Sequence, residues 1–97
     1  MINSIFFTAP LSSRAVEVTD GGGFECIFHA NIGGKNGTVW VTCYYRGKKA
    51  EAIFPHLTKG TMVCVHGALG PRESERDGSI IINAREVAAL EQGECSP

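Results

Sequence analysis

Residues Thr38 to Arg46, with the sequence TVWVTCYYR, carry the clearest structural pattern in this chain. Two sets of residues alternate along it, and successive side chains of a β-strand point to opposite sides of a sheet. One set is suited to a core and consists of Val39, Val41, Cys43 and Tyr45. The other set consists of Trp40, Thr42, Tyr44 and Arg46. The pattern predicts a half-buried strand that exposes two aromatic rings, a hydroxyl group and a guanidinium group together.

Two interpretations of this exposed set are open. Nucleobases stack on flat aromatic side chains, so the set could bind single-stranded nucleic acid. An aromatic-rich strand is also typical of a sheet that packs on both faces or that meets a partner subunit. The nine residues are compatible with both interpretations.

The length and composition are those of one globular domain. Of the 97 residues, 43% are hydrophobic and 20% are charged, and the formal net charge is −1. Overall charge therefore gives no argument for nucleic-acid binding, but its distribution does. Between residues 35 and 59 there is one acidic residue, Glu51, and the basic residues are Lys35, Arg46, Lys48, Lys49 and Lys59. Positive charge thus surrounds the aromatic strand, although a solvated basic loop would have the same composition.

Cysteine spacing and the N-terminal sequence indicate a cytoplasmic protein. The four cysteines, at positions 26, 43, 64 and 95, have the spacing of neither a metal site nor a redox motif. We expect them to be reduced and mostly buried. The segment MINSIFFTAP lacks the basic region of a signal peptide, and no stretch approaches the roughly 18 apolar residues of a membrane helix. No contact with a membrane is expected.

The rest of the chain predicts four more strand segments and one helix. The strands are expected at residues 2–8 with a continuation at 14–18, at 24–30, at 62–69 and at 79–87, with a hairpin tip at 72–78. Apolar residues at positions 50, 53, 54 and 57 form a helical stripe. Pro55 either ends this helix near Phe54 or tightens its last turn.

A small sheet must hide its edges, and closure into a barrel does so with few residues. The predicted fold is therefore all-β, a five-stranded OB-fold barrel with one short helix between strands 3 and 4. We expect residues 1–90 to form this domain and residues 91–97 to form a short, frayed C-terminal tail.

From about Thr38 to Val87 the sequence resembles the bacterial single-stranded DNA-binding proteins. In that family an aromatic strand ends in Gly-Lys and is followed by a helix that opens with Ala-Glu, a Lys-Gly turn and a Val-x-Gly strand. The same order and spacing are found here in Gly47-Lys48, Ala50-Glu51, Lys59-Gly60 and Val65-His66-Gly67. The resemblance implies an OB-fold and places the family's base-stacking tryptophan at Trp40.

The chain departs from this family in three respects. Arg46 stands where the family usually has an aromatic residue before Gly-Lys. The sequence Gly70-Pro71-Arg72-Glu73 stands where the family often has a second tryptophan. The family's long tail with an acidic tip, which recruits other enzymes, has no counterpart. Short relatives of this kind resemble the primosomal replication protein N, an OB-fold dimer, or copies carried by phages and mobile elements.

Pattern and resemblance together favour sequence-independent binding of single-stranded DNA in replication, recombination or repair. The candidate DNA-binding residues are Trp40, Thr42, Tyr44, Arg46, Lys48, Lys49 and Arg72. Trp40 and Tyr44 would stack on bases, and the four basic residues would neutralise phosphates. The apolar first strand, with Ile2, Ile5, Phe6 and Phe7, predicts a homo-oligomer, either a dimer or a tetramer. Replication or repair proteins are possible further partners.

The alternative function is an OB-fold protein-interaction or oligomerisation module of the primosome type, with weak or no DNA binding. An enzyme is not expected, because the sequence has no phosphate-binding loop, paired carboxylates or nucleophile elbow. His29, His56, His66 and Cys64 are interpreted as ordinary surface or core residues. No cofactor and no metal ion are expected.

Overall fold

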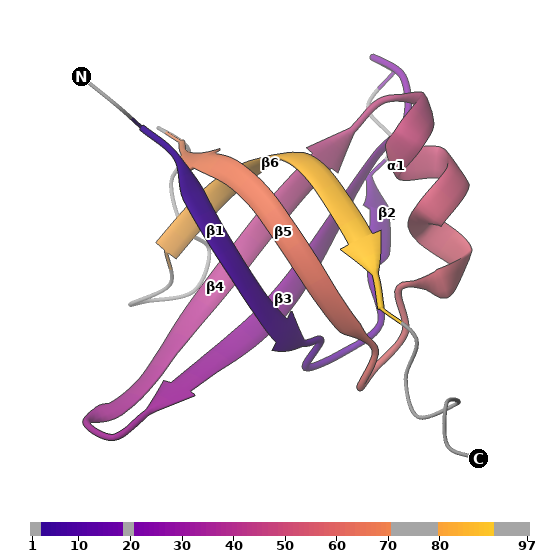
Figure 1. The fold of residues 1–97 in the computed structure, drawn as a ribbon. Coiled ribbons are helices and arrows are strands. Elements are labelled where there is room, and N and C mark those ends of the chain that lie inside the picture. The colour runs from indigo at the N-terminus through magenta and orange to yellow at the C-terminus, as the bar shows by residue number, and fades with distance from the viewer. Residues whose placement is uncertain (1–2, 19–20, 71–79, 91–97) are drawn as a thin grey trace.

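The computed structural model describes residues 3–18, 21–70 and 80–90, which form one strongly curved six-stranded sheet and a short helix (Figure 1). The strands are β1 (Ile5–Pro10), β2 (Val16–Val18), β3 (Glu25–Gly34), β4 (Gly37–Arg46), β5 (Met62–Leu69) and β6 (Ile80–Ala89). Their order in the sheet is β1-β5-β6-β4-β3-β2. The β4–β6 pair is parallel and the other pairs are antiparallel. The all-β prediction and the OB-fold arrangement are confirmed.

The predicted first strand is divided in two, which gives six strands where five were expected. β1 pairs with β5, whereas β2 pairs with β3. The break follows Pro10, which has no amide hydrogen to donate to a continued ladder. Leu11 then bridges to Ala30, and the Ser12 amide donates to the His29 carbonyl at 3.0 Å. Among the described residues, these contacts connect the end of β1 to β3. The two terminal strands of the sheet, β1 and β2, do not pair with each other.

The helix follows β4, as predicted. α1 (Lys48–Ile53) begins after Gly47, whose φ of +108° is a conformation that glycine adopts readily. It continues as a 3₁₀ turn, η1 (Phe54–His56), with Pro55 inside it. The helix packs against β3, β4 and β6, and it buries Ala50 completely. The predicted effect of the proline is confirmed, because the α-helix ends and a tighter turn takes over.

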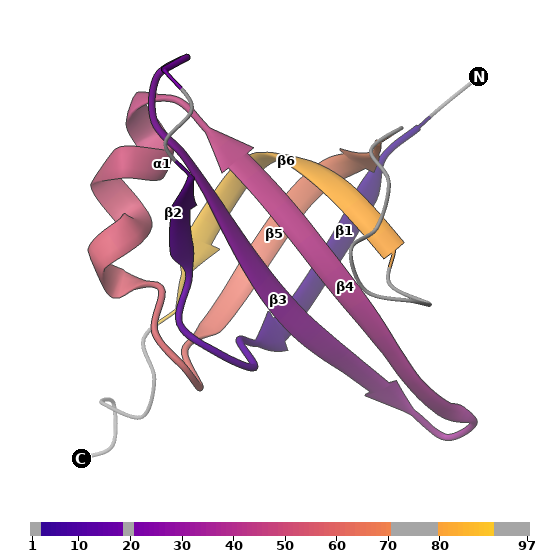
Figure 2. The same ribbon diagram turned by 180° about the vertical axis from the view of Figure 1, so that it is seen from behind.

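Alternation along the strands builds the core on the inner side of the curved sheet. The buried core residues include Cys26, Phe28, Val41, Cys43, Tyr45, Val63, Val65 and Ile82. One member of the predicted inner set, Val39, is 42% exposed instead. The β3–β4 hairpin extends beyond the barrel as a long arm (Figure 2). Val39 faces Ile32 on this arm, beyond Val41, the first β4 residue that pairs with β6.

At Gly67 the backbones of β5 and β6 leave no room for a side chain. Gly67 lies beside a β-bulge at His66/Gly67, where the register of the β5–β6 ladder shifts. A Cβ atom here would overlap the carbonyl oxygen of Asn83 and would lie 2.9 Å from Cα of Ala84. Since both atoms belong to the backbone, the strands would have to separate to admit any side chain. Glycine is therefore required at this position.

Candidate nucleic-acid interface

The outer side of β3 and β4 forms one continuous surface, which we call the β3–β4 face. It carries the row Trp40, Thr42, Tyr44 and Arg46 from β4, opposite Asn31, His29, Ile27 and Glu25 from β3. Side chains of directly paired residues lie on the same side of a sheet. The structure thus brings four of the sequence-predicted residues together on one side of the β3–β4 pair, the two strands that lie in front in Figure 2.

Exposure is uneven along this row. Trp40 is 39% exposed, Tyr44 is half-buried and Arg46 is exposed. Thr42 is only 6% exposed, so the prediction that it is exposed with its neighbours was wrong. This small side chain lies between His29 on β3 and Ile81 on β6, and its hydroxyl is 3.1 Å from Nδ1 of His29. Thr42 therefore orients its neighbour and presents little surface of its own.

Arg46 lies opposite an acidic residue that the sequence did not pair with it. Nη2 of Arg46 is 3.9 Å from Oε1 of Glu25. Glu25 is 4% exposed, which is rare for a carboxylate unless a cation or hydrogen bonds accompany it. The register that sets Glu25 against Arg46 emerges only from the folded sheet.

Asn31 is a second residue whose relevance the sequence did not reveal. It is the cross-strand partner of Trp40 on the arm. Its side-chain oxygen is buried and, among the described residues, has no hydrogen-bond partner. An amide is thus held directly beside the most exposed ring of this face.

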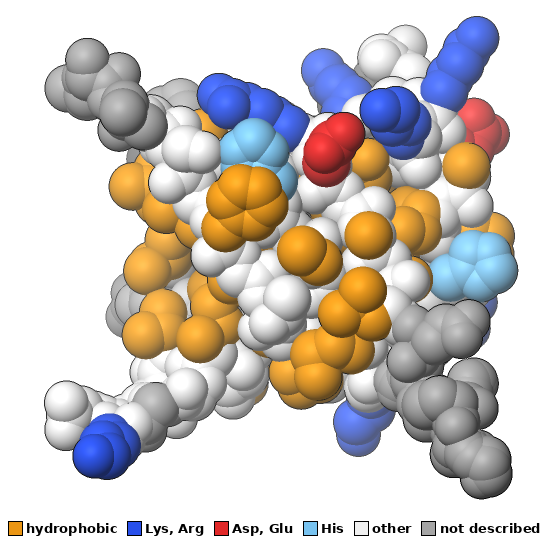
Figure 3. Space-filling view, in the orientation of Figure 1, with side chains coloured by type: hydrophobic (Ala, Val, Ile, Leu, Met, Phe, Trp, Pro, Cys, Tyr) orange, Lys and Arg blue, Asp and Glu red, His pale blue; other side chains and the backbone are white. Residues whose placement is uncertain are grey.

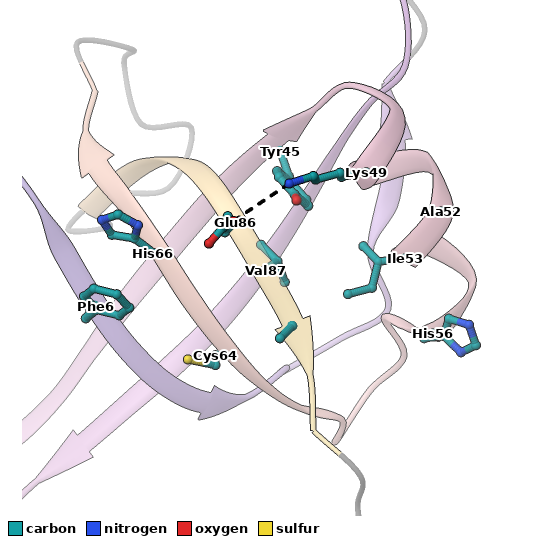
Figure 4. Close-up of a pocket in the computed structure, with 11 residues that line it drawn as sticks. Phe6, Tyr45, Lys49, Ala52, Ile53, His56, Cys64, His66, Glu86 and Val87 are labelled. Atoms are coloured by element: carbon teal, nitrogen blue, oxygen red, sulfur yellow. Dashed lines mark ion pairs between the residues drawn. The ribbon is translucent and has the colours of Figure 1, made fainter.

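The predicted lysines do not all join the row. Lys48 is exposed at the first turn of α1, immediately after β4. Lys49 turns towards β6, where its Nζ is 3.8 Å from Oε2 of Glu86 (Figure 4). Arg72 lies outside the described residues. Of the four predicted phosphate ligands, Arg46 and Lys48 are the two that the structure places along the path of β4 and its continuation.

A second outer surface lies on the opposite side of the barrel, and we call it the β1–β5–β6 face. Its outward residues are Phe6, Thr8, Cys64, His66, Glu86 and Ala88. Phe6 is 69% exposed and stacks on His66, with ring centroids 4.3 Å apart and planes 6° from parallel. Nε2 of His66 is 3.0 Å from the Ser4 hydroxyl. Figure 3 shows hydrophobic side chains gathered over this face, with basic ones along its upper margin.

A groove of about 550 Å³ opens on the β1–β5–β6 face between the sheet and α1. Its floor and walls are mainly apolar, and the Lys49–Glu86 ion pair lies at its upper end (Figure 4). The lining residues are Phe6, Tyr45, Lys49, Ala52, Ile53, His56, Cys64, His66, Glu86, Val87 and Ala88. An apolar, concave surface of this kind suits a protein partner better than a phosphate backbone.

Burial on the inner side of the sheet makes the thiols of Cys26 and Cys43 weak acids. Burial raises the pKa of Cys26 to about 11, with a smaller contribution from the charge of Glu25. Burial also raises the pKa of Cys43 to about 12. Both groups stay protonated at neutral pH, so neither acts as a thiolate nucleophile. Within the described residues, no three His, Cys, Asp or Glu side chains are grouped closely enough to hold a metal ion.

No protein-family model and no curated protein matches this sequence. Among the described residues, no helix has the length and apolar character needed to cross a membrane.

Solved structures do resemble the fold. A deletion variant of the single-stranded DNA binding protein from Thermus aquaticus has a TM-score of 0.74 and 22% sequence identity, over 95% of this chain and 52% of that one. The small single-stranded DNA-binding protein from Streptomyces coelicolor has a TM-score of 0.71 and 20% identity, over 93% of this chain and 96% of that one. This chain therefore spans about half the length of the Thermus protein. Its fold is the OB-fold of these two bacterial single-stranded DNA-binding proteins.

Proposed function

We propose that this chain binds single-stranded DNA without sequence preference through the β3–β4 face. The observation that carries this proposal is the row of Trp40, Tyr44 and Arg46 on the outer side of one strand of an OB-fold. Every base has a flat π-face, so stacking on such groups tolerates any sequence. The Thermus aquaticus and Streptomyces coelicolor structures described above are named as single-stranded DNA-binding proteins, which supports the same ligand here.

Trp40 and Tyr44 would supply the stacking, and the basic residues near the end of β4 would attract the backbone. Lys48 is exposed where α1 follows the strand. Lys49 is 78% exposed in its ion pair with Glu86, and a pair so open to solvent is weak enough to exchange for a phosphate. We propose Arg72 as a further phosphate ligand only because it is a basic residue in the hairpin predicted at residues 72–78.

We further propose that copies of this chain associate through the β1–β5–β6 face. β1 is a terminal strand of the sheet, and its ring Phe6 projects beside an apolar groove. A ring and a groove on the same face allow two copies related by a two-fold axis to bury each other's apolar surface. Such an oligomer would present several DNA faces in the cytoplasm during replication, recombination or repair, where replication or repair proteins could join it.

Titration of fluorescein-labelled oligo-dT, followed by anisotropy, tests the DNA-binding proposal. We expect binding to single strands and much weaker binding to a duplex of the same length, because paired bases cannot reach Trp40. The logarithm of the binding constant should fall linearly with the logarithm of salt concentration, by about 0.7 per phosphate neutralised. Equal binding to single strands and duplex would contradict stacking as the source of affinity.

The groove gives specific support to a second candidate function, a protein-interaction or oligomerisation module. In that case the β1–β5–β6 face would be the functional surface and DNA binding would be weak or absent. Light scattering in parallel with the titration separates the two functions. An oligomer that shows no anisotropy change with oligo-dT at low salt would favour the interaction module.

A further inference from the structure

We propose that Arg46 presents a flat stacking surface to a base and that Glu25 is the positioning residue that holds it there. Arg46 would then not neutralise a phosphate. This inference rests on the proposed binding of single-stranded DNA by the β3–β4 face. It assigns a different role to the one cation within the row Trp40, Thr42, Tyr44 and Arg46.

The two partners differ sharply in their exposure to solvent. Glu25 and Arg46 are directly paired across β3 and β4, and their charged groups are 3.9 Å apart. The Arg46 side chain is 54% exposed, whereas that of Glu25 is 5% exposed. The carboxylate is thus covered and the guanidinium group is at the surface. The buried carboxylate of Glu25 can therefore hold the exposed guanidinium group of Arg46 in place.

Burial of the carboxylate opposes release of Arg46 to a phosphate. A buried charge is tolerated when a counter-charge or hydrogen bonds compensate it, and removal of a compensating partner is costly. Moving the guanidinium group of Arg46 to a DNA phosphate would withdraw positive charge from Glu25. Binding of a phosphate by Lys48 would withdraw no charge from Glu25, because Lys48 is exposed at the start of α1.

The shape of Arg46 suits the remaining role. A guanidinium group is planar and stacks on flat rings, and bases stack on arginine planes as they do on aromatic ones. Arg46 lies two residues beyond Tyr44 on the same side of β4, roughly 7 Å along the strand. Trp40, Tyr44 and Arg46 would then form three successive flat surfaces. A charge already compensated by Glu25 would add little to counterion release.

Two substitutions of Arg46 separate shape from charge. Arg46→Lys keeps the charge and loses the plane, whereas Arg46→Met loses both. The measurement is the anisotropy of labelled oligo-dT at several salt concentrations, with Lys48→Met as the matched control. We expect both Arg46 variants to bind at least about fivefold more weakly with an unchanged salt slope. Lys48→Met should lower the magnitude of the slope by about 0.7.

Glu25→Gln tests the positioning role directly. The released guanidinium group should then reach a phosphate, so the magnitude of the slope should rise by about 0.7. The proposal is overturned if Arg46→Lys binds like the wild type while Arg46→Met loses about 0.7 of slope, or if Glu25→Gln folds and leaves the slope unchanged. Should Glu25→Gln fail to fold, the two Arg46 variants decide the question. No binding by the wild type would overturn the proposed function as well, whereas normal wild-type binding confines the failure to Arg46.

Discussion

The β3–β4 face and the β1–β5–β6 face each expose an aromatic ring, but the rings have different surroundings. Trp40 is 39% exposed in a row that ends in the Arg46–Glu25 ion pair. Phe6 is 69% exposed, stacks on His66 and borders an apolar groove. Alternation alone determines that a ring points outward from the barrel. The charge and the concavity around the ring indicate which kind of partner it can bind.

The position of each strand in the sheet adds to this difference. β4 is an interior strand, and its residues Val41 to Tyr45 pair with β3 on one side and β6 on the other, so the backbone beneath Thr42 and Tyr44 has ladder partners on both sides. β1 is a terminal strand, paired with β5 on one side. A terminal strand offers backbone groups to another chain, which suits it to association with a second copy.

Gly67→Ala should have the largest effect, because it would disturb the scaffold that carries both faces. The added methyl group would meet the backbone of Asn83 and Ala84 across the β5–β6 ladder. We expect the free energy of unfolding in urea to fall by about 3 kcal/mol or more, with loss of both DNA binding and association. Gly33→Ala is the matched control, since a Cβ atom there has nothing within 4 Å. Equal stability of the two variants would contradict the described register of β5 and β6.

Phe6→Ser should weaken association through the β1–β5–β6 face and leave DNA binding unchanged. Burial of a phenylalanine side chain is worth about 1.5 to 3 kcal/mol, and a two-fold interface would lose two of them. Light scattering should show a smaller mass at low micromolar concentration, with DNA affinity per chain retained. Val16→Ser is the control, because Val16 is 63% exposed on β2, away from this face. An unchanged mass for Phe6→Ser would argue against association through Phe6.

Trp40→Ala should weaken DNA binding by the β3–β4 face and leave association unchanged. Loss of one stacking platform costs roughly 1 to 3 kcal/mol, so anisotropy should report binding about 5- to 150-fold weaker. The mass should not change. Val39→Ala provides the control, since Val39 is 42% exposed on the other side of the same arm. If the two variants lost the same affinity, the arm would contribute through its general shape and not through the ring.

At neutral pH the smallest expected effect is that of the core thiols, whose ionisation destabilises the core that both faces share only as the pH becomes alkaline. The pKa of Cys26 is raised from 9.0 to about 11 and that of Cys43 to about 12, chiefly by burial. The folded state therefore holds these protons above pH 9, where the unfolded chain releases them, and stability falls as pH rises. The loss should be on the order of 1 kcal/mol per thiol for each pH unit between 9 and 11.

Urea denaturation at pH 8, 9 and 10 measures this loss. A variant with both Cys26→Ala and Cys43→Ala should show a shallower dependence on pH than the wild type. The same pH dependence in both proteins would show that these thiols do not carry the effect. Cys64, on the β1–β5–β6 face, is unchanged in this variant.

Much of the fold could be predicted from local patterns. Alternation identified Val41, Cys43 and Tyr45 as inner residues, and all three are buried. The strand predicted at 62–69 has the bounds of β5, and Pro55 changed the helix type as expected. These features depend on the intrinsic period of a strand or helix and on the missing amide of proline, which a sequence shows directly.

Features that depend on register could not be predicted in this way. Thr42 is buried because His29 and Ile81 flank it from two other strands, and Val39 is exposed because the arm outreaches β6. The pairing of Arg46 with Glu25 likewise requires the β3–β4 register. The groove beside Phe6 combines side chains from β1, α1, β5 and β6, which no local pattern brings together. The DNA-binding roles of Trp40, Tyr44 and the lysines stay predictions.

The fluorescence of Trp40 during titration with unlabelled oligo-dT tests the central claim most directly. Trp40 is the single tryptophan of the chain, so its emission reports on the β3–β4 face alone. We predict saturable quenching at low salt that reverses when salt is added, because a base stacks on the ring and phosphates hold the strand. Emission that stays constant while anisotropy shows the DNA bound would place the binding site elsewhere and contradict the proposed function of this face.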